Sequence, residues 1–364
     1  MPGFPVAALP DGPLDIVGDV HGELEALERL LARLGYSDGR HPEGRRLVFV
    51  GDLVDRGHDS VGVLERVMPW VAAGHASCIL GNHELNLLTG ERKPGNGWWF
   101  GEAERWRHGA WSGEYGSALA TEALRERALA FFRGLPLVLE RSDLRVVHAA
   151  WAPAAAAGLE GLSSAAALPA FDAASAGALA ADRAADEDWQ EERRLHPSLL
   201  TAEVEDSPPR LPRHGAWAYA EQQRLPHKLL TSGGERPLGE DERPFQAGGK
   251  WRMARRHRWW EDYSGDKPVV VGHYWRVWDE VDPPPSLSRP ADAPPREPRT
   301  AWLGPRGRVY CVDFSVGLRF QARSGYGREE QSRLAALRWD GGPPRLFTDR
   351  DEGALIIEPP GCAR

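Results

Sequence analysis

The sequence predicts an α/β fold in which polar side chains follow the carboxyl ends of buried strands. Five short apolar runs end in polar or glycine residues and are expected to be strands: Leu14–Asp19, Arg46–Asp52, Ala76–Asn82, Leu144–Ala149 and Pro268–His273. Between the first three runs, apolar residues recur at steps of three and four, which predicts helices over Glu23–Leu34 and Ser60–Val71. Asp52 lies 33 residues after Asp19, and Asn82 lies 30 residues after Asp52, about the length of one strand–helix–strand unit. Open α/β sheets bind ligands at such strand ends.

Composition divides the chain into four expected segments. These are a first core segment over residues 1–151, an insertion over 152–266, a second core segment over 267–350 and a tail over 351–364. Alanine dominates the start of the insertion, a charged stretch follows, and prolines then interrupt any continuous helix, which favours a partly helical cap. In the second core segment, Arg308–Arg323 and Ser332–Asp340 have the composition of strands.

Overall composition narrows the class of protein. A chain of 364 residues with 41% hydrophobic content can bury a substantial core. The formal charge of -8 argues against general binding of nucleic-acid backbones. Three widely separated cysteines indicate neither a disulfide framework nor a thiolate zinc site, so a reducing cytoplasm is the expected location. No basic leader and no run of about 18 apolar residues is visible, so neither secretion nor membrane spanning is expected.

The residues at the strand ends are ligands that suit hard or borderline metals. The motifs are "GDVHG" from Gly18, "GDLVDRG" from Gly51 and "GNHE" from Gly81, joined by His148 and His273. Carboxylate, amide and imidazole groups without thiolate favour manganese, iron or zinc. Two-metal hydrolases need a ligand between ions about 3.5–4 Å apart, and Asp52 is placed to be that bridge. Each motif alone is more often a turn, a surface histidine or a salt bridge, but five in order favour a site.

This ordered series resembles the calcineurin-like metallophosphoesterases, and in particular their phosphoprotein phosphatase branch. That branch includes serine/threonine phosphatases and symmetrical diadenosine tetraphosphate hydrolases. The resemblance covers roughly the first 150 residues and then residues 267–325. It implies a four-layer metallophosphoesterase-type β-sandwich flanked by helices, with residues 152–266 as an added, partly helical insertion. It also implies two divalent or trivalent metal ions, with manganese expected and iron or zinc as alternatives.

The resemblance also implies a role for each motif residue. Asp19, His21 and Asp52 would bind one metal, and the second would take the ligands Asp52, Asn82, His148 and His273. A hydroxide bridging the metals would attack phosphorus, while His83 protonates the leaving oxygen as general acid. Asp55 would orient His83 and hold its proton. Arg56 would grip phosphate oxygens, with Asn82 as a further substrate contact.

Some positions depart from the family pattern. Bulky side chains follow the last two histidines, at Trp151, Tyr274 and Trp275, and are expected to narrow the mouth of the site. The second phosphate-binding arginine of the protein phosphatases has no clear counterpart. Three arginines of the insertion are candidates for it: Arg252, Arg255 and Arg256.

Two segments, 95–116 and 249–265, interleave tryptophan with arginine. Such segments can stack bases and hold phosphates, but we expect these tryptophans to pack the insertion onto the core, with a lid over the metals as an extension.

Three functions stay open at this point. The first is a metal-dependent hydrolase of phosphate monoesters of the serine/threonine protein phosphatase type. A hydrolase of dinucleoside polyphosphates, acting symmetrically on diadenosine tetraphosphate, is the second. The third is a silent metal-bound interaction module that docks partners through the insertion; an intact His83 beside Asp55 argues against it. The expected partner is thus a phosphorylated protein or a small phosphoester or nucleotide.

Overall fold

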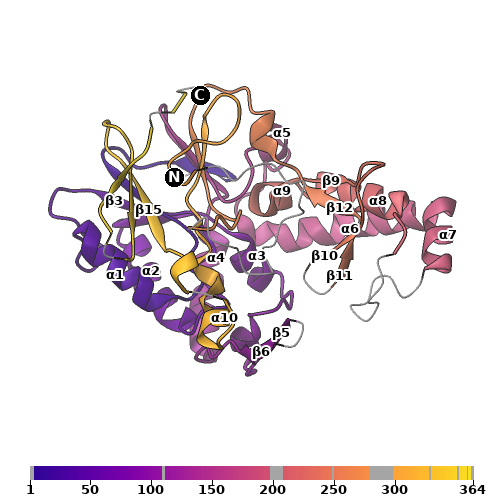
Figure 1. Ribbon diagram of the computed structural model, residues 1–364, viewed down its shortest axis with the longest axis horizontal. Helices are drawn as coiled ribbons and strands as arrows, with labels where there is room; N and C mark the ends of the chain where they lie inside the picture. Colours follow the sequence, from indigo (N-terminus) through magenta and orange to yellow (C-terminus); the bar gives the residue numbers. More distant parts are fainter. Residues whose placement is uncertain are drawn as a thin grey trace.

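Two β-sheets form the centre of the computed structural model, which describes residues 4–108, 111–196, 208–247, 250–278, 298–327, 329–350, 352–358 and 360–361 (Figure 1). The six-stranded sheet runs in the order β17 (Leu355–Ile356), β16 (Arg345–Thr348), β15 (Ala335–Trp339), β2 (Leu14–Val17), β3 (Arg46–Phe49) and β4 (Ala76–Cys78). The five-stranded sheet runs in the order β1 (Val6–Ala8), β7 (Val138–Glu140), β8 (Arg145–Val147), β13 (Val269–Val271) and β14 (Val309–Cys311).

The two sheets pack face to face, and helices cover their outer faces. Ile16 and Val48 of the six-stranded sheet share one buried cluster with Val146 and Val270 of the five-stranded sheet. Alternate residues of the same strands, such as Phe49, point to the opposite face, because side chains alternate along a strand. That face packs on the apolar stripes of α1 (Leu24–Leu34) and α2 (Ser60–Ala72). This arrangement confirms the predicted α/β sandwich flanked by helices.

Parallel pairing brings the strand ends together. Strands β2, β3 and β4 are parallel, with Val17 opposite Phe49 and Phe49 opposite Cys78. In the other sheet β8 and β13 are parallel, with Val146 opposite Val270. The polar residues that follow these strands therefore emerge at one edge of the sandwich. The helices expected over 23–34 and 60–71 are present with bounds that differ by one residue.

The prediction of a strand over residues 308–323 is largely wrong. Within Arg308–Arg323 only β14 is a strand, and the chain continues into η5 (Val316–Leu318) and α10 (Arg319–Arg323). The reversal begins at Ser315, whose φ is +60° and whose N–H donates to Asp313 Oδ1 at 2.8 Å. It buries Arg319, which pairs with Asp349 at 2.8 Å. A polar side-chain bond within the run thus overrides its apolar pattern.

Shorter elements complete the core around the strands. They are α3 (Asn82–Leu88), η1 (Gly97–Phe100), β5 (Arg105–His108), β6 (Trp111–Glu114), α4 (Glu122–Gly134) and η6 (Glu329–Gln331). Helix α3 begins directly after the third strand end, so the "GNHE" motif forms its first turn. No helix in the described part of the chain is long and apolar enough to cross a membrane.

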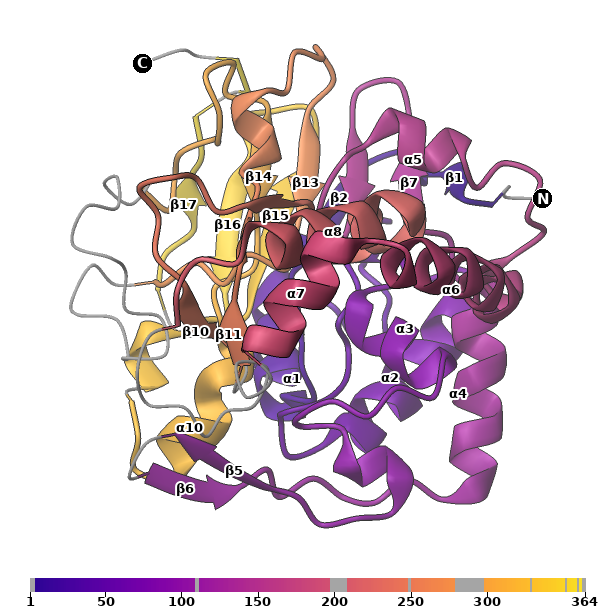
Figure 2. The same ribbon diagram turned by 90° about the vertical axis from the view of Figure 1, so that its right-hand side faces the viewer.

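The predicted insertion combines helices with short strands. Its elements are α5 (Pro153–Ala157), η2 (Ala165–Ala167), α6 (Leu168–Ala184), α7 (Glu187–Leu195), α8 (Pro212–Arg224), α9 (Pro226–Ser232), β9 (Glu235–Pro237), β10 (Phe245–Ala247), β11 (Lys250–Arg252), β12 (Ala254–Arg256) and η3 (Trp259–Glu261). Helices α6, α7 and α8 extend to the right of the core in Figure 1 and face the viewer in Figure 2. The helical content was predicted, whereas the two antiparallel strand pairs were not.

Candidate metal centre and active site

Six side chains predicted as metal ligands meet at the edge where the strands end. Asp19 and His21 follow β2, Asp52 follows β3, and Asn82 begins α3. From the other sheet, His148 follows β8 and His273 follows β13. All except Asn82 are buried. Both sheets therefore contribute to a single cluster.

The carboxylate of Asp52 lies at the centre of this cluster. Its Oδ2 is 3.4 Å from His148 Nε2, 3.7 Å from His21 Nε2 and 3.9 Å from His83 Nε2. The Oδ1 atom accepts a hydrogen bond from the backbone N–H of His83 at 2.9 Å, which fixes the carboxylate plane. Three imidazoles thus converge on one oxygen, and two of them, His21 and His148, are predicted to bind different metals.

Asn82 and Asp19 join the remaining ligands. Asn82 Oδ1 lies 2.9 Å from His273 Nδ1 and 3.2 Å from His148 Nε2. Asp19 Oδ2 accepts from the backbone N–H of His273 at 3.0 Å. A side chain at Gly272 would collide with this carboxylate, because its Cβ would lie 2.0 Å from Asp19 Oδ1. Glycine at position 272 is therefore a requirement of the close approach.

The donor set fits divalent metals. Asp19 Oδ1 and His273 Nε2 are buried and have no hydrogen-bond partner among the described residues. Buried polar atoms without a partner are rare and costly, so a ligand for them is expected. Two groups of side chains have donor atoms close enough to share an ion: His21, Asp52 and His83, and Asp52, His148 and His273. Asp52 belongs to both groups.

The predicted proton donor sits in a short chain of hydrogen bonds. His83 Nδ1 lies 2.6 Å from Asp55 Oδ2, while its Nε2 faces Asp52. The other oxygen of Asp55 accepts from Trp98 Nε1 at 2.7 Å. All three side chains are buried, so the carboxylate of Asp55 is held in one orientation between the indole and the imidazole.

The predicted phosphate-binding arginine lies beside the ligands. Arg56 Nη1 donates to His21 Nε2 at 2.8 Å, and its guanidinium stacks over the Trp275 ring at 4.3 Å. Of the three further candidates, Arg256 approaches the centre, with Nη1 3.5 Å from the backbone oxygen of His273. Arg255 instead pairs with Glu242 at 3.3 Å.

Comparison with known proteins finds a family match for the first part of the chain. The calcineurin-like phosphoesterase family matches residues 12–155, the segment that supplies Asp19, His21, Asp52, Asn82 and His148. Residues 12–155 are a calcineurin-like metallophosphoesterase domain. The predicted resemblance is thereby confirmed for that part of the chain, and the family implies a dinuclear divalent metal centre.

Named relatives of the metallophosphoesterase domain are tetraphosphatases. An asymmetrical bis(5′-nucleosyl)-tetraphosphatase of Oceanobacillus iheyensis is 50% identical over 74 residues, 19% of this chain and 30% of that protein. An asymmetrical one of Geobacillus thermodenitrificans is 32% identical over 146 residues, 37% of this chain and 56% of that protein. A symmetrical one of Ralstonia nicotianae is 42% identical over 86 residues, 23% of this chain and 28% of that protein. The chain thus matches between about a quarter and just over half of the length of these relatives.

Electrostatics separate the histidines of the metallophosphoesterase site into two kinds. Burial, with Arg56 beside it, holds the pKa of His21 well below its ordinary value, and burial with Arg256 does the same for the pKa of His273. Burial also opposes charge on His148, but the Asp52 carboxylate outweighs it and raises the pKa of His148 to about 10. His148 and Asp52 therefore form a buried ion pair when no other cation is near. Metal ligands must be deprotonated, so a metal would have to take the place of the His148 proton.

Backbone strain is concentrated at the site. Non-glycine residues with positive φ include His21 (+47°), Asp52 (+49°), Asp55 (+73°), Arg56 (+69°) and His273 (+68°). Such residues cost on the order of 1–3 kcal/mol each and cluster at functional sites. Five of the nine predicted site residues thus adopt a backbone conformation that favours glycine.

Two residues with a part in the site were not identified from the sequence. Glu84 accepts backbone hydrogen bonds from Asp52 at 2.9 Å, Leu53 at 2.8 Å and Gly81 at 3.0 Å, and so ties two ligand loops together. Asp313 accepts from the backbone N–H groups of Trp275 at 2.7 Å and Ser315 at 2.8 Å. Glu84 occupies the third helical position of α3, where a capping glutamate is common, and that position was the available signal.

Several tryptophans of segments 95–116 and 249–265 are buried, but Trp106 packs on Phe320 and Tyr326 of the second core segment and not on the insertion. Trp99, Trp106, Trp259 and Trp260 are buried. Trp98 is buried too, but its bond to Asp55 gives it a contact with the predicted proton donor that packing alone did not suggest. Of the bulky residues expected at the mouth, Trp275 covers Arg56, whereas Trp151 lies under Arg145, 3.6 Å from its guanidinium.

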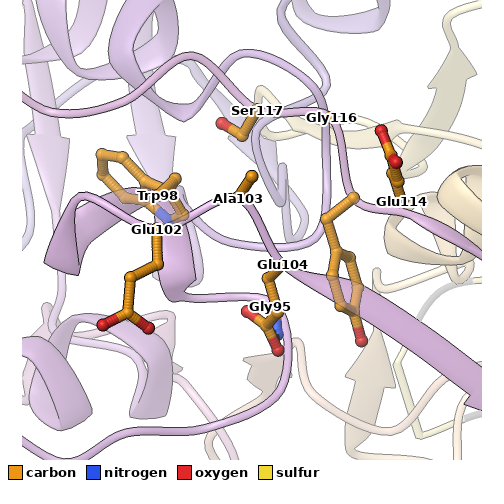
Figure 3. A pocket seen from close by; sticks show the side chains of 9 residues that line it. Gly95, Trp98, Glu102, Ala103, Glu104, Glu114, Gly116 and Ser117 are labelled. Carbon is orange, nitrogen blue, oxygen red and sulfur yellow. Dashed lines mark hydrogen bonds between the residues drawn. The ribbon is translucent and has the colours of Figure 1, made fainter.

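A small hollow adjoins the Trp98 ring. It is lined by Gly95, Trp98, Glu102, Ala103, Glu104, Glu114, Tyr115, Gly116 and Ser117, and its three glutamates are drawn in Figure 3. The space is about 50 Å³, enough for a few water molecules and too small for a nucleobase. Glu102 and Glu114 are paired with Arg92 at 2.7 Å and Arg105 at 2.8 Å. The hollow is therefore no substrate pocket.

Proposed function

We propose that this protein is a metal-dependent phosphoric ester hydrolase whose substrates are dinucleoside polyphosphates. The observation that carries the proposal is the convergence of His21, His83 and His148 on Asp52 Oδ2. The proposal retains the core segments at 1–151 and 267–350 and the insertion at 152–266, because both core segments supply candidate ligands. The expected tail at 351–364 instead contributes β17 to the six-stranded sheet.

Each ligand has a place in the proposed centre. Asp19, His21 and Asp52 would hold one metal, since His21 Nε2 lies 3.9 Å from Asp19 Oδ2 and 3.7 Å from Asp52 Oδ2. The other metal would take the ligands Asp52, Asn82, His148 and His273. Metals bound there would act as Lewis acids on the phosphoryl oxygens and lower the pKa of water. Carboxylate, amide and imidazole donors are compatible with manganese, iron and zinc, and manganese is the metal we would test first.

His83 is the proposed general acid. Its Nδ1 is occupied by Asp55, so Nε2 is the atom free to give a proton to the leaving oxygen. The Asp55 carboxylate orients the imidazole, and Trp98 keeps that carboxylate in place. An intact pair of this kind supports turnover and speaks against a silent interaction module.

Arg56 is the proposed phosphate ligand. Its planar guanidinium can hold two phosphoryl oxygens, and the Trp275 ring restricts it to one plane. A cation on His21 Nε2 would compete with the hydrogen bond that Arg56 now makes to that atom, and would release the guanidinium for substrate. Arg256, from the insertion, is placed for a second phosphate contact, because its Nη1 lies 3.5 Å from the backbone oxygen of His273.

The choice of substrate rests on the relatives. Tetraphosphatases match the domain at 50%, 32% and 42% identity over the aligned residues. The phosphoprotein substrate expected first from the sequence gains no comparable support, so dinucleoside polyphosphates become the leading proposal. Because named relatives include symmetrical and asymmetrical enzymes, the position of cleavage is an outcome to be measured.

The test is product analysis with the manganese-loaded protein. Diadenosine tetraphosphate, a phosphoserine peptide and an aryl phosphate would be compared at equal concentration, with nucleotides separated by chromatography. Two molecules of ADP would indicate symmetrical cleavage, and ATP with AMP asymmetrical cleavage. A strong preference for the peptide would overturn the proposed substrate class, and no turnover of any of the three would overturn the proposed activity.

A further inference from the structure

The residue after His148 is held entirely by the predicted insertion. Ala149 donates its backbone N–H to Leu230 of α9 at 2.9 Å. Its carbonyl oxygen accepts from Trp259 Nε1 at 3.2 Å. Leu230, Trp259 and Ala149 are all buried, so water does not compete for these bonds. Both polar backbone groups next to this ligand are therefore bonded to residues 152–266.

The side chain after His273 packs on the same segment. The Tyr274 ring meets the Trp260 ring edge to face, with centroids 4.8 Å apart. Gly233, directly after α9, passes so close to Tyr274 that an added Cβ would lie 2.6 Å from the tyrosine oxygen. The insertion also reaches His273 itself, because Arg256 Nη1 lies 3.5 Å from its backbone oxygen.

The ligand loops of the six-stranded sheet are held differently. The backbone N–H groups of Val20 and His21 donate to the Asp52 oxygen at 3.0 and 2.9 Å, and Glu84 bonds the backbone of Asp52. These bonds all lie within the first core segment. The insertion thus meets the loops of His148 and His273, which share one candidate ion with Asp52.

We propose that the insertion positions His148 and His273 and thereby sets the affinity of the metal site that they share with Asp52. Trp259 and Trp260 are the positioning residues. The inference rests on the proposed function, since it assumes that these histidines bind a metal. Groups that orient metal ligands typically change metal affinity by about 10–100-fold when they are removed. Since Trp259 acts through the neighbouring backbone, the lower end of this range is expected.

The test compares two tryptophans in similar surroundings. Trp259 and Trp302 are each 8% exposed, and each donates its indole N–H to a backbone oxygen. Trp302 bonds Glu358 in the sandwich, away from the ligands. Trp259→Phe and Trp302→Phe each keep a ring and lose the N–H. Manganese binding would be measured by equilibrium dialysis on both variants and the unaltered protein, with thermal unfolding of the metal-free proteins alongside.

We expect the protein to bind one of the two manganese ions more weakly and the other unchanged. Trp259→Phe should bind one manganese as before and the second about tenfold more weakly. Trp302→Phe should bind both as the unaltered protein does, with a similar loss of thermal stability. Equal binding by the two variants would overturn the inference and leave the proposed function intact. Fewer than two manganese ions on the unaltered protein would overturn the proposed metal centre, and the inference with it.

A second variant guards against a folding failure. Trp260→Leu removes the ring that packs on Tyr274 and leaves the Trp259 bond to Ala149 in place. Trp260→Leu should weaken binding of the same manganese ion. Excess manganese should restore hydrolysis in both Trp259→Phe and Trp260→Leu. Unchanged manganese binding in a folded Trp260→Leu protein would contradict the role assigned to the insertion.

Discussion

The six-stranded and five-stranded sheets both present candidate metal ligands beyond their strand ends, but the loops that carry these residues are held by different means. In the six-stranded sheet, Glu84 gathers the backbone of Asp52, Leu53 and Gly81, so one buried side chain holds two ligand loops. In the five-stranded sheet, the residue after each histidine contacts the predicted insertion, through a hydrogen bond at Ala149 and a ring contact at Tyr274.

This difference bears on how the two halves of the candidate metal centre can vary: the first half carries Asp19, His21 and Asp52, and the second carries His148 and His273. The first half is built from residues close together in the sequence, within 19–84, and its supports lie there too. The second half draws on His148, His273 and the predicted insertion between them, so on our proposal a change in the insertion would alter metal binding without replacing a candidate ligand. A cap of this kind can alter affinity as well as substrate choice.

The largest expected effect comes from the residue that the two halves share. Asp52→Asn removes the charge on which three histidines converge, so binding of both metals should fail. Turnover should fall by a factor on the order of 10³ or more, since several kcal/mol of charge stabilisation are lost. Metal content and phosphate release would be measured, with Asp15→Asn, a buried carboxylate paired with Arg338, as control. Full retention of one ion would show that the halves bind independently.

The next effect concerns the proton donor of the first half. His83→Asn should slow hydrolysis of an alkyl phosphate by about 10²–10⁴-fold, because a poor leaving group needs the proton. An aryl phosphate with a good leaving group should be affected much less. Rates for a series of leaving groups would give this dependence, with His41→Asn as a variant at a distant histidine bonded to Leu34. Equal losses across the series would remove His83 from the role of acid.

A third prediction concerns Glu84, the support of the first half. Glu84→Gln places an amide N–H₂ against backbone N–H groups, so the free energy of unfolding should fall by about 1–3 kcal/mol. Binding of the metal proposed at Asp19, His21 and Asp52 should also weaken. Denaturant unfolding and dialysis would measure the two effects. Glu104→Gln is the matched control, because Glu104 accepts backbone N–H groups of Gly95 and Gly97 away from the ligands. Similar metal loss in both variants would contradict the role of Glu84.

The smallest effect is expected at Trp98. Trp98→Phe keeps the ring and removes the bond to Asp55, so the loss on a poor leaving group should be about tenfold, within the worth of one hydrogen bond to a charged group. Steady-state rates on the same leaving-group series would show it. Trp99→Phe, whose ring packs on Phe132, should leave those rates unchanged. A loss in both variants, or in neither, would show that Asp55 needs no indole.

Much of the fold follows from local pattern. Strand ends could be located because apolar runs stop abruptly at "GD", "GN" and "GH", and parallel pairing then brings them together. Helices α1 and α2 were predicted to within one residue because their buried faces repeat at helical spacing. The family resemblance of the motifs implied the candidate ligands, and the structure gathers all six of these side chains at one edge.

What escaped prediction depends on contacts between distant residues. Glu84 is four residues before Leu88 in a short helix, and only folding shows that its carboxylate faces Asp52. The reversal at Ser315 depends on a bond to Asp313 that an apolar run conceals. The contact between Trp259 and Ala149 spans 110 residues, and no local pattern encodes such a pairing.

The left-handed residues around the site have a consequence for attempts to make this protein more resistant to heat. Ser315 and Trp275 adopt φ values of +60° and +50°, and the Asp313 carboxylate secures both. Glycine at either position would relieve unfavourable backbone geometry in the folded state. A selection for survival at high temperature could thus favour glycine at 275, and the same change would remove the ring over which the Arg56 guanidinium stacks. Glycine at 275 would then raise thermal stability while weakening the proposed binding of phosphate by Arg56.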